Sequence, residues 1–169
     1  MYVKRWLWMM VLAVLLCGCK AEETLETVSD EWIVPVMAQP KGISVRLPEN
    51  TVLPVMEQDG RKLYMGQNYE ILLETLAAGD LNDTIRTISG FEKEQLTVLQ
   101  TGQGELDRYE FVWTATGERG ELLGRAVILD DGNYHYVLTA MADAQDAGKL
   151  SQTWQTVFQS FGLEPNNDA

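Results

Sequence analysis

Cysteine and histidine are almost absent from this sequence. Its 169 residues include two cysteines, Cys17 and Cys19, and one histidine, His135. There is no CxxC pair and no cluster of cysteine and histidine, which excludes the common zinc sites. If the chain is cleaved between its two cysteines, only one remains, so an internal disulfide is not expected. The sequence therefore predicts a domain stabilised by its hydrophobic core, with no metal and no cofactor.

Basic residues are also scarce. The chain has 13 lysines and arginines against 25 aspartates and glutamates, which gives a formal net charge of −12. Lys4 and Arg5 lie within residues 1–18, which contain no acidic residue, so the rest of the chain is more acidic still. Such a surface repels phosphate groups, which excludes nucleic acids as partners. It also opposes electrostatic docking onto anionic lipid, so any attachment to a membrane must be covalent.

No apolar run is long enough to cross a membrane as a helix. The longest, Leu7–Leu16, has ten residues where about 20 are needed, and with Lys4 and Arg5 before it the run is typical of a signal peptide. Leu16-Cys17-Gly18-Cys19 resembles the bacterial lipobox, an aliphatic residue and two small residues before a cysteine. The resemblance implies cleavage after Gly18 and a diacylglyceryl group on Cys19. We therefore expect an exported lipoprotein on the extracytoplasmic side of the bacterial cell membrane, with an ordinary secretory signal or an uncleaved anchor as alternatives.

The remaining chain divides by composition into three parts. Residues 19–30 are polar and acidic, and we interpret them as the lipidated N-terminus and a tether. Residues 31–163 have the patterns of one globular domain, and residues 164–169 those of a C-terminal tail. Two Asp-Gly pairs indicate β-hairpins within the domain, at Asp59-Gly60 and at Asp131-Gly132. The second is predicted to be the type I′ centre of a two-residue hairpin.

Two helices are predicted among the strands. Asp80 precedes a short helix with Leu81, Ile85 and Ile88 on one face and Gly90 at its end. A last helix is predicted from Asp143 to Gly162, with an apolar stripe that must lie on the sheet. That stripe consists of Leu150, Trp154, Val157, Phe158 and Phe161. The fold class predicted is α+β, an antiparallel sheet of about six or more strands packed by two helices.

The order of these elements resembles a known family. An early strand reads Ile43-Ser-Val-Arg-Leu-Pro-Glu49, and a late one reads Tyr134-His-Tyr-Val-Leu-Thr-Ala140 before a helix that closes on Val157-Phe-Gln-Ser-Phe161. In this it resembles the PsbP/DcrB-like sandwich domains, many of which are bacterial lipoproteins. The resemblance implies an accessory or binding role in the cell envelope. The family has no shared catalytic centre, so the resemblance implies no catalytic residue.

Residues that might carry chemistry have simpler explanations. The sequence has no GxSxG nucleophile motif with which His135 could act as a general base. Because His135 lies between two tyrosines of a strand, we expect its ring to face solvent or a neighbouring strand. Asp130-Asp131-Gly132-Asn133 clusters oxygen ligands, but turn formation explains the run and the EF-hand spacing is absent. The acidic pairs Asp80/Asp83 and Glu92/Glu94 suit a helix start and a charged connector. No catalytic residue is therefore predicted.

Five aromatic residues on neighbouring strands are the candidate binding site. They are Tyr109, Phe111, Trp113, Tyr134 and Tyr136. Together they would line a hydrophobic groove for a ligand or peptide, and the alternative is that they form core facing the Trp154 helix. The function predicted is a non-enzymatic accessory domain that binds a protein partner or a small ligand. An envelope hydrolase with an unrecognised active site and a structural subunit of a membrane complex are the alternatives.

Overall fold

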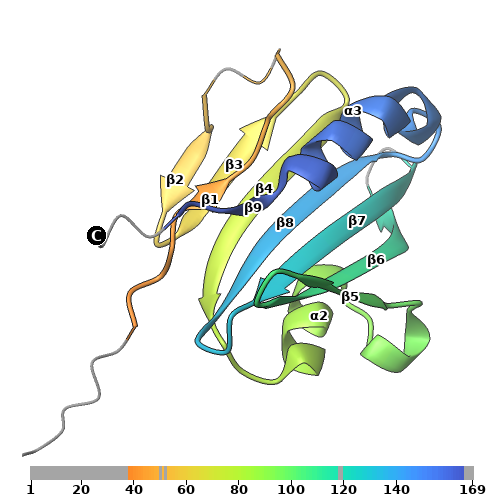
Figure 1. Ribbon diagram of the computed structural model, residues 1–169. Coiled ribbons are helices and arrows are strands. Elements are labelled where there is room, and N and C mark those ends of the chain that lie inside the picture. Colours follow the sequence, from red (N-terminus) through yellow and green to blue (C-terminus); the bar gives the residue numbers. More distant parts are fainter. Residues whose placement is uncertain (1–37, 50, 52, 118–119, 166–169) are drawn as a thin grey trace, which may run out of the picture. The chain divides into compact units, whose positions relative to one another are not determined.

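The computed structural model describes residues 38–49, 51, 53–117 and 120–165 (Figure 1). These residues form a seven-stranded antiparallel sheet in the order β2-β3-β4-β8-β7-β6-β5 and a two-stranded sheet of β1 and β9. The strands are β1 Ile43–Ser44, β2 Met56–Gln58, β3 Arg61–Met65, β4 Tyr69–Ala77, β5 Leu99–Gln103, β6 Leu106–Gly117, β7 Gly120–Asp130, β8 Tyr134–Asp143 and β9 Gly162–Leu163. Two α-helices, α2 Leu81–Ser89 and α3 Ala147–Ser160, and a 3₁₀ turn, η1 Lys93–Gln95, complete the fold. The predicted α+β class is confirmed.

The predicted signal peptide, Cys19 and the tether lie outside the described residues, as do residues 31–37 of the predicted domain. Of the predicted tail, Glu164 and Pro165 are described, and the amide of Glu164 still donates to the carbonyl of Gly42 at 2.8 Å. Within the part of the chain that the structure describes, no helix is both long enough and apolar enough to cross a membrane.

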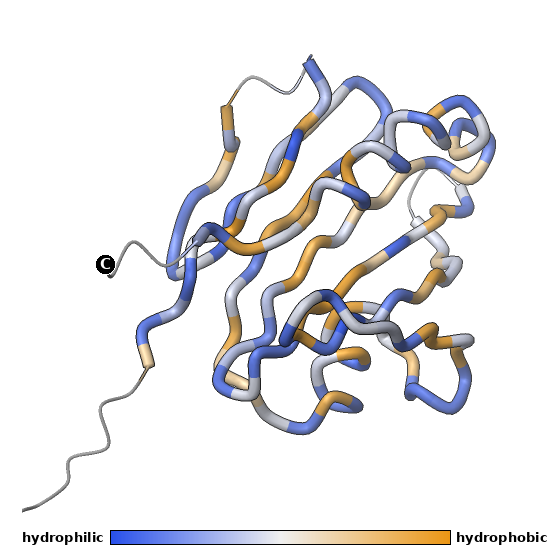
Figure 2. Tube along the Cα trace, in the orientation of Figure 1, coloured by the Kyte–Doolittle hydropathy of each residue, from blue (hydrophilic) through white to orange (hydrophobic). Residues whose placement is uncertain are grey.

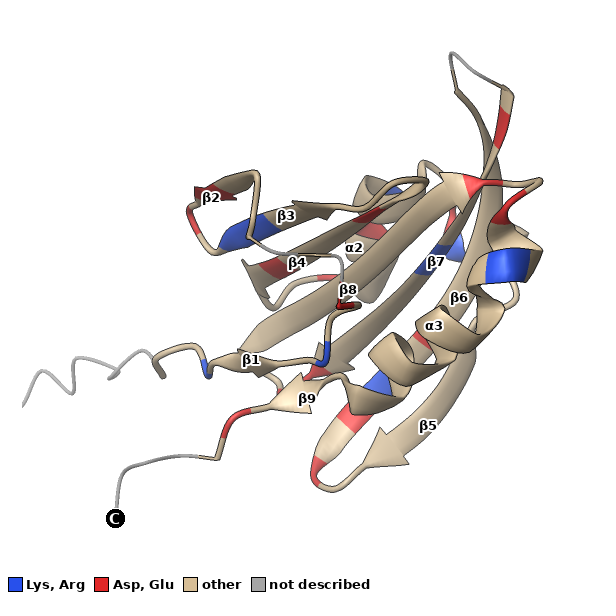
Figure 3. Ribbon diagram, turned by 90° about the horizontal axis from the view of Figure 1, so that it is seen from above, with Lys and Arg blue, Asp and Glu red and all other residues tan. Residues whose placement is uncertain are grey.

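The most apolar strands of the sheet are its central ones, β4, β8 and β7, which lie side by side (Figure 2). Successive strand residues point to opposite faces, and the runs Val127–Leu129 and Tyr136–Leu138 are buried on both. A strand that is buried on both faces needs a cover on each. The helices supply it, with α3 on one face and α2 on the other (Figures 1 and 3).

Helix α3 packs through the predicted apolar stripe, but its bounds differ from the prediction. Asp143 does not begin the helix, because it is the last residue of β8 and pairs with Leu122 of β7. Phe161 follows the helix in extended conformation, with φ −68° and ψ 123°, and still buries its ring. Gly162 then continues into β9, which pairs with β1. The Ile43–Leu47 strand is correspondingly shorter than predicted, because only its first two residues pair.

Helix α2 has the predicted ends. The Asp80 carboxylate accepts a hydrogen bond from the amide of Asn82 at 2.9 Å, and Gly90 adopts the left-handed conformation at the other end. Ile85 is fully buried against β6, β7 and β8. Beside it, the indole of Trp113 lies over Gly124, where a Cβ atom would be 2.3 Å from the ring. A glycine in β7 therefore gives the tryptophan of β6 the space to lie flat on the sheet.

The two Asp-Gly turns have different geometries. Asp59 and Gly60 both have positive φ, 49° and 76°, as a type I′ hairpin requires, and the predicted hairpin is confirmed. At the second turn only Gly132 has positive φ, and the amide of Asp131 bonds the carbonyl of Tyr134 at 3.3 Å. Gly132 and Asn133 are thus the central residues, with the φ pattern of type II′, so the predicted centre is wrong by one residue. The Asp131 carboxylate accepts from the amides of Asn133 and Tyr134, which holds Asp131 before the turn.

A short helical turn precedes the strand that follows α2. The side chain of Gln95 accepts from the amide of Glu92 at 2.8 Å, and residues 93–95 form η1. Strand β5 begins at Leu99 and runs through Gly102 to pair with β6. The turn that follows therefore centres on Gly104, whose φ is 66°.

Candidate binding groove

The five aromatic residues proposed from the sequence do not line one groove. Tyr109, Phe111 and Trp113 are buried on the α2 face, where they pack with Ile85. Tyr136 is buried on the α3 face, and Tyr134 packs at the edge of the same cluster. The alternative, a core facing the Trp154 helix, is right for Tyr136 and wrong for the three residues of β6. The register decides this, because Tyr109 lies opposite Ile128 on the side of the sheet that α2 covers.

His135 also lies on the α2 face and is not exposed to solvent. Its side chain is 1% exposed. Its Nδ1 atom is 2.8 Å from the Thr84 hydroxyl of α2, and its Nε2 atom is 3.5 Å from the Asp130 carboxylate of β7. Of the two orientations expected, the one toward solvent is wrong, and the contacts of the ring are with a helix and a neighbouring strand. The buried imidazole therefore connects α2 to the sheet through its contacts with Thr84 and Asp130.

The carboxylates of the second hairpin are used within the turn. Asp130 accepts from the amide of Gly132, and Asp131 accepts from two amides and from the hydroxyl of Tyr136 at 3.0 Å. Burial opposes the ionisation of Asp131, but these three donors lower its pKa below the ordinary value. Among the described residues no three His, Cys, Asp or Glu side chains lie close enough to hold a metal ion.

The acidic pairs are likewise explained by local structure. The Asp80 carboxylate caps α2, and Asp83 pairs with Arg86 one turn later. Arg86 also reaches Glu92 in the connector at 3.3 Å. These are surface ion pairs around one arginine, as is common on exposed helices.

A different part of the α2 face is open. Helix α2 covers only the end of the sheet that carries His135 and Val137. Further along, among the described residues, the side chains of β3, β4 and β8 that point to the same face are bordered by Thr87 and Ile88 of α2 at one end and are open beyond it. Cross-strand pairing sets Leu63, Leu72 and Thr139 in one row, and Met65, Glu70 and Met141 in the next.

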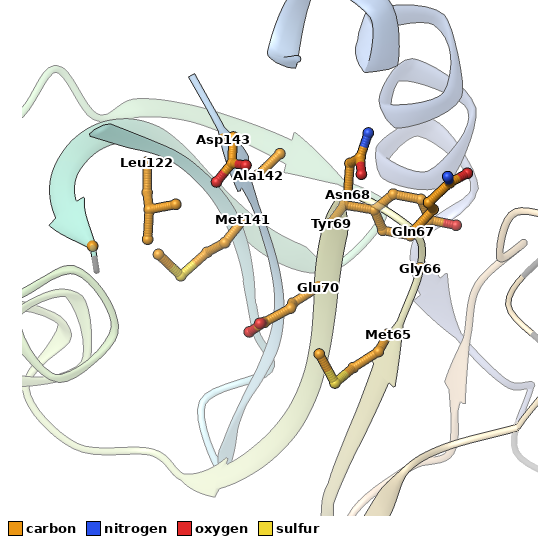
Figure 4. A pocket seen from close by; sticks show the side chains of 11 residues that line it. Met65, Gly66, Gln67, Asn68, Tyr69, Glu70, Leu122, Met141, Ala142 and Asp143 are labelled. Carbon is orange, nitrogen blue, oxygen red and sulfur yellow. The ribbon is translucent and has the colours of Figure 1, made fainter. Parts of the chain in front are cut away.

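These rows form the floor of a groove with two connected lobes. One lobe, of about 310 Å³, lies between the Met65–Glu70 turn, Leu122 and Met141–Asp143. The other, of about 230 Å³, lies between the sheet and the Thr87 and Ile88 side chains of α2. Glu70 and Met141 line both lobes, and Figure 4 shows them directed into the same space as Met65 and Leu122. We call this site the open-face groove: Arg61, Leu63, Met65, Glu70, Leu72, Glu74, Leu122, Thr139, Met141 and Asp143.

The two glutamates of the open-face groove differ in whether they form an ion pair. Glu74 is buried and forms an ion pair with Arg61, with 2.7 Å between Nε and Oε1. Glu70 is exposed, and neither it nor Asp143 forms a side-chain hydrogen bond or ion pair with another described residue. Figure 3 shows acidic bands on β4 and at the end of β8, with basic residues on β3. The groove is therefore neutralised at its Arg61 end and negative at its Glu70 end.

Thr139 adds a polar group to the floor. The residue is 6% exposed, and its hydroxyl has no hydrogen-bond partner among the described residues. A buried hydroxyl without a partner costs roughly 1–3 kcal/mol. Thr139 lines one lobe, but its hydroxyl has almost no solvent exposure, so an occupant would meet this group only after rotation about χ1.

Sequence reasoning missed this groove because its residues are far apart along the chain. The signal present in the sequence is the pair Glu70 and Glu74 within the apolar run of β4, both on one face. An apolar strand that carries two glutamates at the spacing of one face indicates a polar surface on that side.

Comparison with known proteins supports the fold. No protein-family model and no curated protein matches this sequence. The solved structures with a similar fold include cyanobacterial PsbP (CyanoP) from Synechocystis, with a TM-score of 0.53 and 11% identity over 73% of this chain and 87% of that one. A protein from Bacteroides thetaiotaomicron aligns with a TM-score of 0.52 and 12% identity over 75% of this chain, which spans 46% of that protein. The chain has a PsbP-like α+β fold.

A third structure is weaker evidence. LpqN of Mycobacterium tuberculosis, described as involved in cell envelope biogenesis, aligns with a TM-score of 0.47 and 11% identity. The alignment covers 76% of this chain and 87% of LpqN. A similarity at that level adds no support to the fold assignment.

Proposed function

We propose that this chain is an exported, lipid-anchored accessory domain that binds a protein partner or a small ligand in the open-face groove and catalyses no reaction. The observation that carries the proposal is the groove itself. It combines apolar side chains with an exposed glutamate that pairs with no other described residue, and its floor includes a buried hydroxyl without a hydrogen-bond partner among the described residues. Concave sites with a few convergent polar groups are where proteins bind ligands.

The route of the chain into the domain is compatible with an anchor at Cys19. The hydroxyl of Tyr134 donates to the carbonyl of Ala38, and the amide of Lys41 donates to the hydroxyl of Tyr136. Both tyrosines lie at the start of β8, whereas the groove residues Met141 and Asp143 lie at its end. The chain thus enters the domain at the end of the sheet away from the Asp143 end of the groove.

The hydrolase alternative is disfavoured by the surroundings of His135. An imidazole that acts as a general base must reach the proton it removes, and this ring is buried with both nitrogens engaged. No specific observation favours a purely structural subunit. A binding role is therefore the function that the described residues support best.

Recovery of bound molecules tests the proposal. Three proteins would be purified from formaldehyde-treated cells that produce them: the wild type, Met65→Arg and Val112→Arg. The proteins and small molecules that co-purify with each would then be quantified by mass spectrometry. Val112 is the matched control, because it is 53% exposed and lies on the α3 face. We expect a molecule retained by the wild type and by Val112→Arg and depleted from Met65→Arg. Equal retention by all three, or loss with Val112→Arg alone, would overturn the proposal.

A further inference from the structure

We propose that the occupant of the open-face groove is an extended polypeptide segment that places apolar side chains on the groove methionines and a lysine or arginine at Glu70. The inference rests on the proposed function, since it names the partner of the same site. Three features of the groove carry it: its length, its apolar lining and its charge.

The groove is elongated along β8. It extends along β8 from the row of Glu74 and Val137 to the row of Leu122 and Asp143. Val137 to Asp143 are seven residues of β8, and the six steps between them span about 20 Å at roughly 3.3 Å per residue. Its two lobes lie in series along this length and meet at Met141. An extended segment of about six residues has the same length, whereas a compact small molecule would fill one lobe and leave the other open.

The apolar lining is suited to more than one side chain. Met65 and Met141 stand on either side of Glu70 in one row, and Met65 is 50% exposed. Methionine is unbranched and polarisable, so it adapts to partners of different shape. Surfaces rich in methionine are typical of sites that bind a range of peptide sequences.

The charge of the groove selects the partner. Arg61 is engaged with Glu74, so the Glu70 end carries the charge that has no partner among the described residues. A basic side chain that reaches Glu70 forms a charge-assisted hydrogen bond at a site flanked by two methionines. The chain's net charge of −12 attracts a basic segment from a distance and repels a second copy of the chain. The exposed carboxylate of Glu70 also opposes a purely apolar lipid chain.

An array of hexapeptides tests this inference with the full chain in detergent micelles. Positions 1 and 5 would be Leu, Met, Phe or Val, position 3 would be Lys, Arg, Gln or Glu, and the other positions Ser. Alternate side chains of an extended peptide share one face, so positions 1, 3 and 5 meet the groove together. We expect lysine or arginine at position 3 to bind at least about tenfold more tightly than glutamine. The dissociation constant of the best peptide would then be measured by fluorescence anisotropy for four proteins: wild type, Glu70→Gln, Glu105→Gln and Met65→Arg.

The variants separate the groove from general acidity. Glu70→Gln should weaken binding at least about tenfold, and Met65→Arg should abolish it. Glu105→Gln removes the same charge from an exposed turn between β5 and β6, at the opposite edge of the sheet. It should change binding less than twofold. Equal weakening by both glutamine variants would reduce the binding to nonspecific attraction and overturn the inference.

Two further results would also overturn it. One is an array with no bound peptide. The other is a peptide with glutamine at position 3 that binds as tightly as the lysine peptide and loses its binding only to the Met65→Arg variant. The groove would then be a binding site, but one that does not select a cationic partner. Failure of the proposed function itself is recognised separately, by equal recovery of bound molecules from Met65→Arg and the wild type.

Discussion

Glu110 is the residue on which an ion network near the end of α3 depends. Its carboxylate bonds the side chain of Arg108 at 2.8 Å and that of Arg125 at 3.0 Å. Arg108 is almost buried and also donates to the carbonyl of Phe158, while Arg125 lies 4.3 Å over the Phe158 ring. The network therefore joins β6 and β7 to the last turns of α3.

The network predicts a pH-dependent contribution to stability. Burial opposes the ionisation of Glu110, but the two guanidinium groups lower its pKa below the ordinary value of 4.5. A carboxylate with a lowered pKa stabilises the folded state fully above that ordinary value, and the contribution is lost as pH falls through the folded pKa. Glu110→Gln should therefore cost about 1–3 kcal/mol at pH 7. Urea unfolding of both proteins should show the difference narrowing below about pH 4, and a difference that is independent of pH would contradict this assignment.

Thr139 offers a second prediction at this scale. Its hydroxyl is buried and has no hydrogen-bond partner among the described residues, so Thr139→Val removes an unsatisfied group and keeps the shape of the side chain. We expect the free energy of unfolding to rise by about 1 kcal/mol, measured by thermal or urea denaturation. A loss of stability of similar size would mean that the hydroxyl has a partner in the folded protein.

Among the elements, the β7–β8 hairpin depends on one glycine. Gly132 has a φ of 84°, which a β-branched residue tolerates poorly, whereas Asn133 has an ordinary φ. Gly132→Val should therefore destabilise the domain by about 1 kcal/mol or more, and Asn133→Val should cost clearly less. Melting temperatures of the two variants measure this, and equal losses would contradict a turn centred on Gly132 and Asn133.

Helix α3 is an internal element and depends on Trp154. This residue is buried and packs edge-on against Phe158, with ring centroids 6.5 Å apart. Trp154→Ala should cost roughly 3–5 kcal/mol, a large share of the about 5–15 kcal/mol by which a folded domain is usually stable. The exposed Gln155→Ala is the control, and near-ultraviolet circular dichroism with urea unfolding gives the comparison. Full stability in Trp154→Ala would show that α3 does not form part of the core.

What could be predicted from sequence follows the range of the interaction. Asp80, Gly90 and the Asp59-Gly60 turn act on neighbouring residues, and their effects were predictable from those residues alone. The face on which Tyr109, Phe111 and Trp113 lie was not, because it depends on pairing between β6, β7 and α2. The groove was hidden for the same reason: Glu70 and Met141 become neighbours only through the pairing of β4 with β8. Long-range register, rather than composition, determines where the site is.

For the whole molecule, the proposed lipid on Cys19 predicts how the chain partitions. The two acyl chains of a diacylglyceryl group hold a protein stably at a membrane, where a single chain gives marginal binding. The full-length chain from cells should enter the detergent phase of a detergent partition, and a chain that begins at Lys20 should stay in the aqueous phase. A truncated chain that still enters the detergent phase would reveal a second membrane-binding surface and contradict a purely covalent anchor.

We propose above that the open half of the α2 face is the binding surface of this domain. Site-specific photo-crosslinking in living cells measures this directly, with p-benzoylphenylalanine in turn at Met65, Met141 and Val112. The first two lie in the open-face groove, and Val112 is exposed on the opposite face of the sheet. We expect a discrete adduct after irradiation from positions 65 and 141 and none from position 112. An adduct from position 112 alone, or from none of the three, would contradict it.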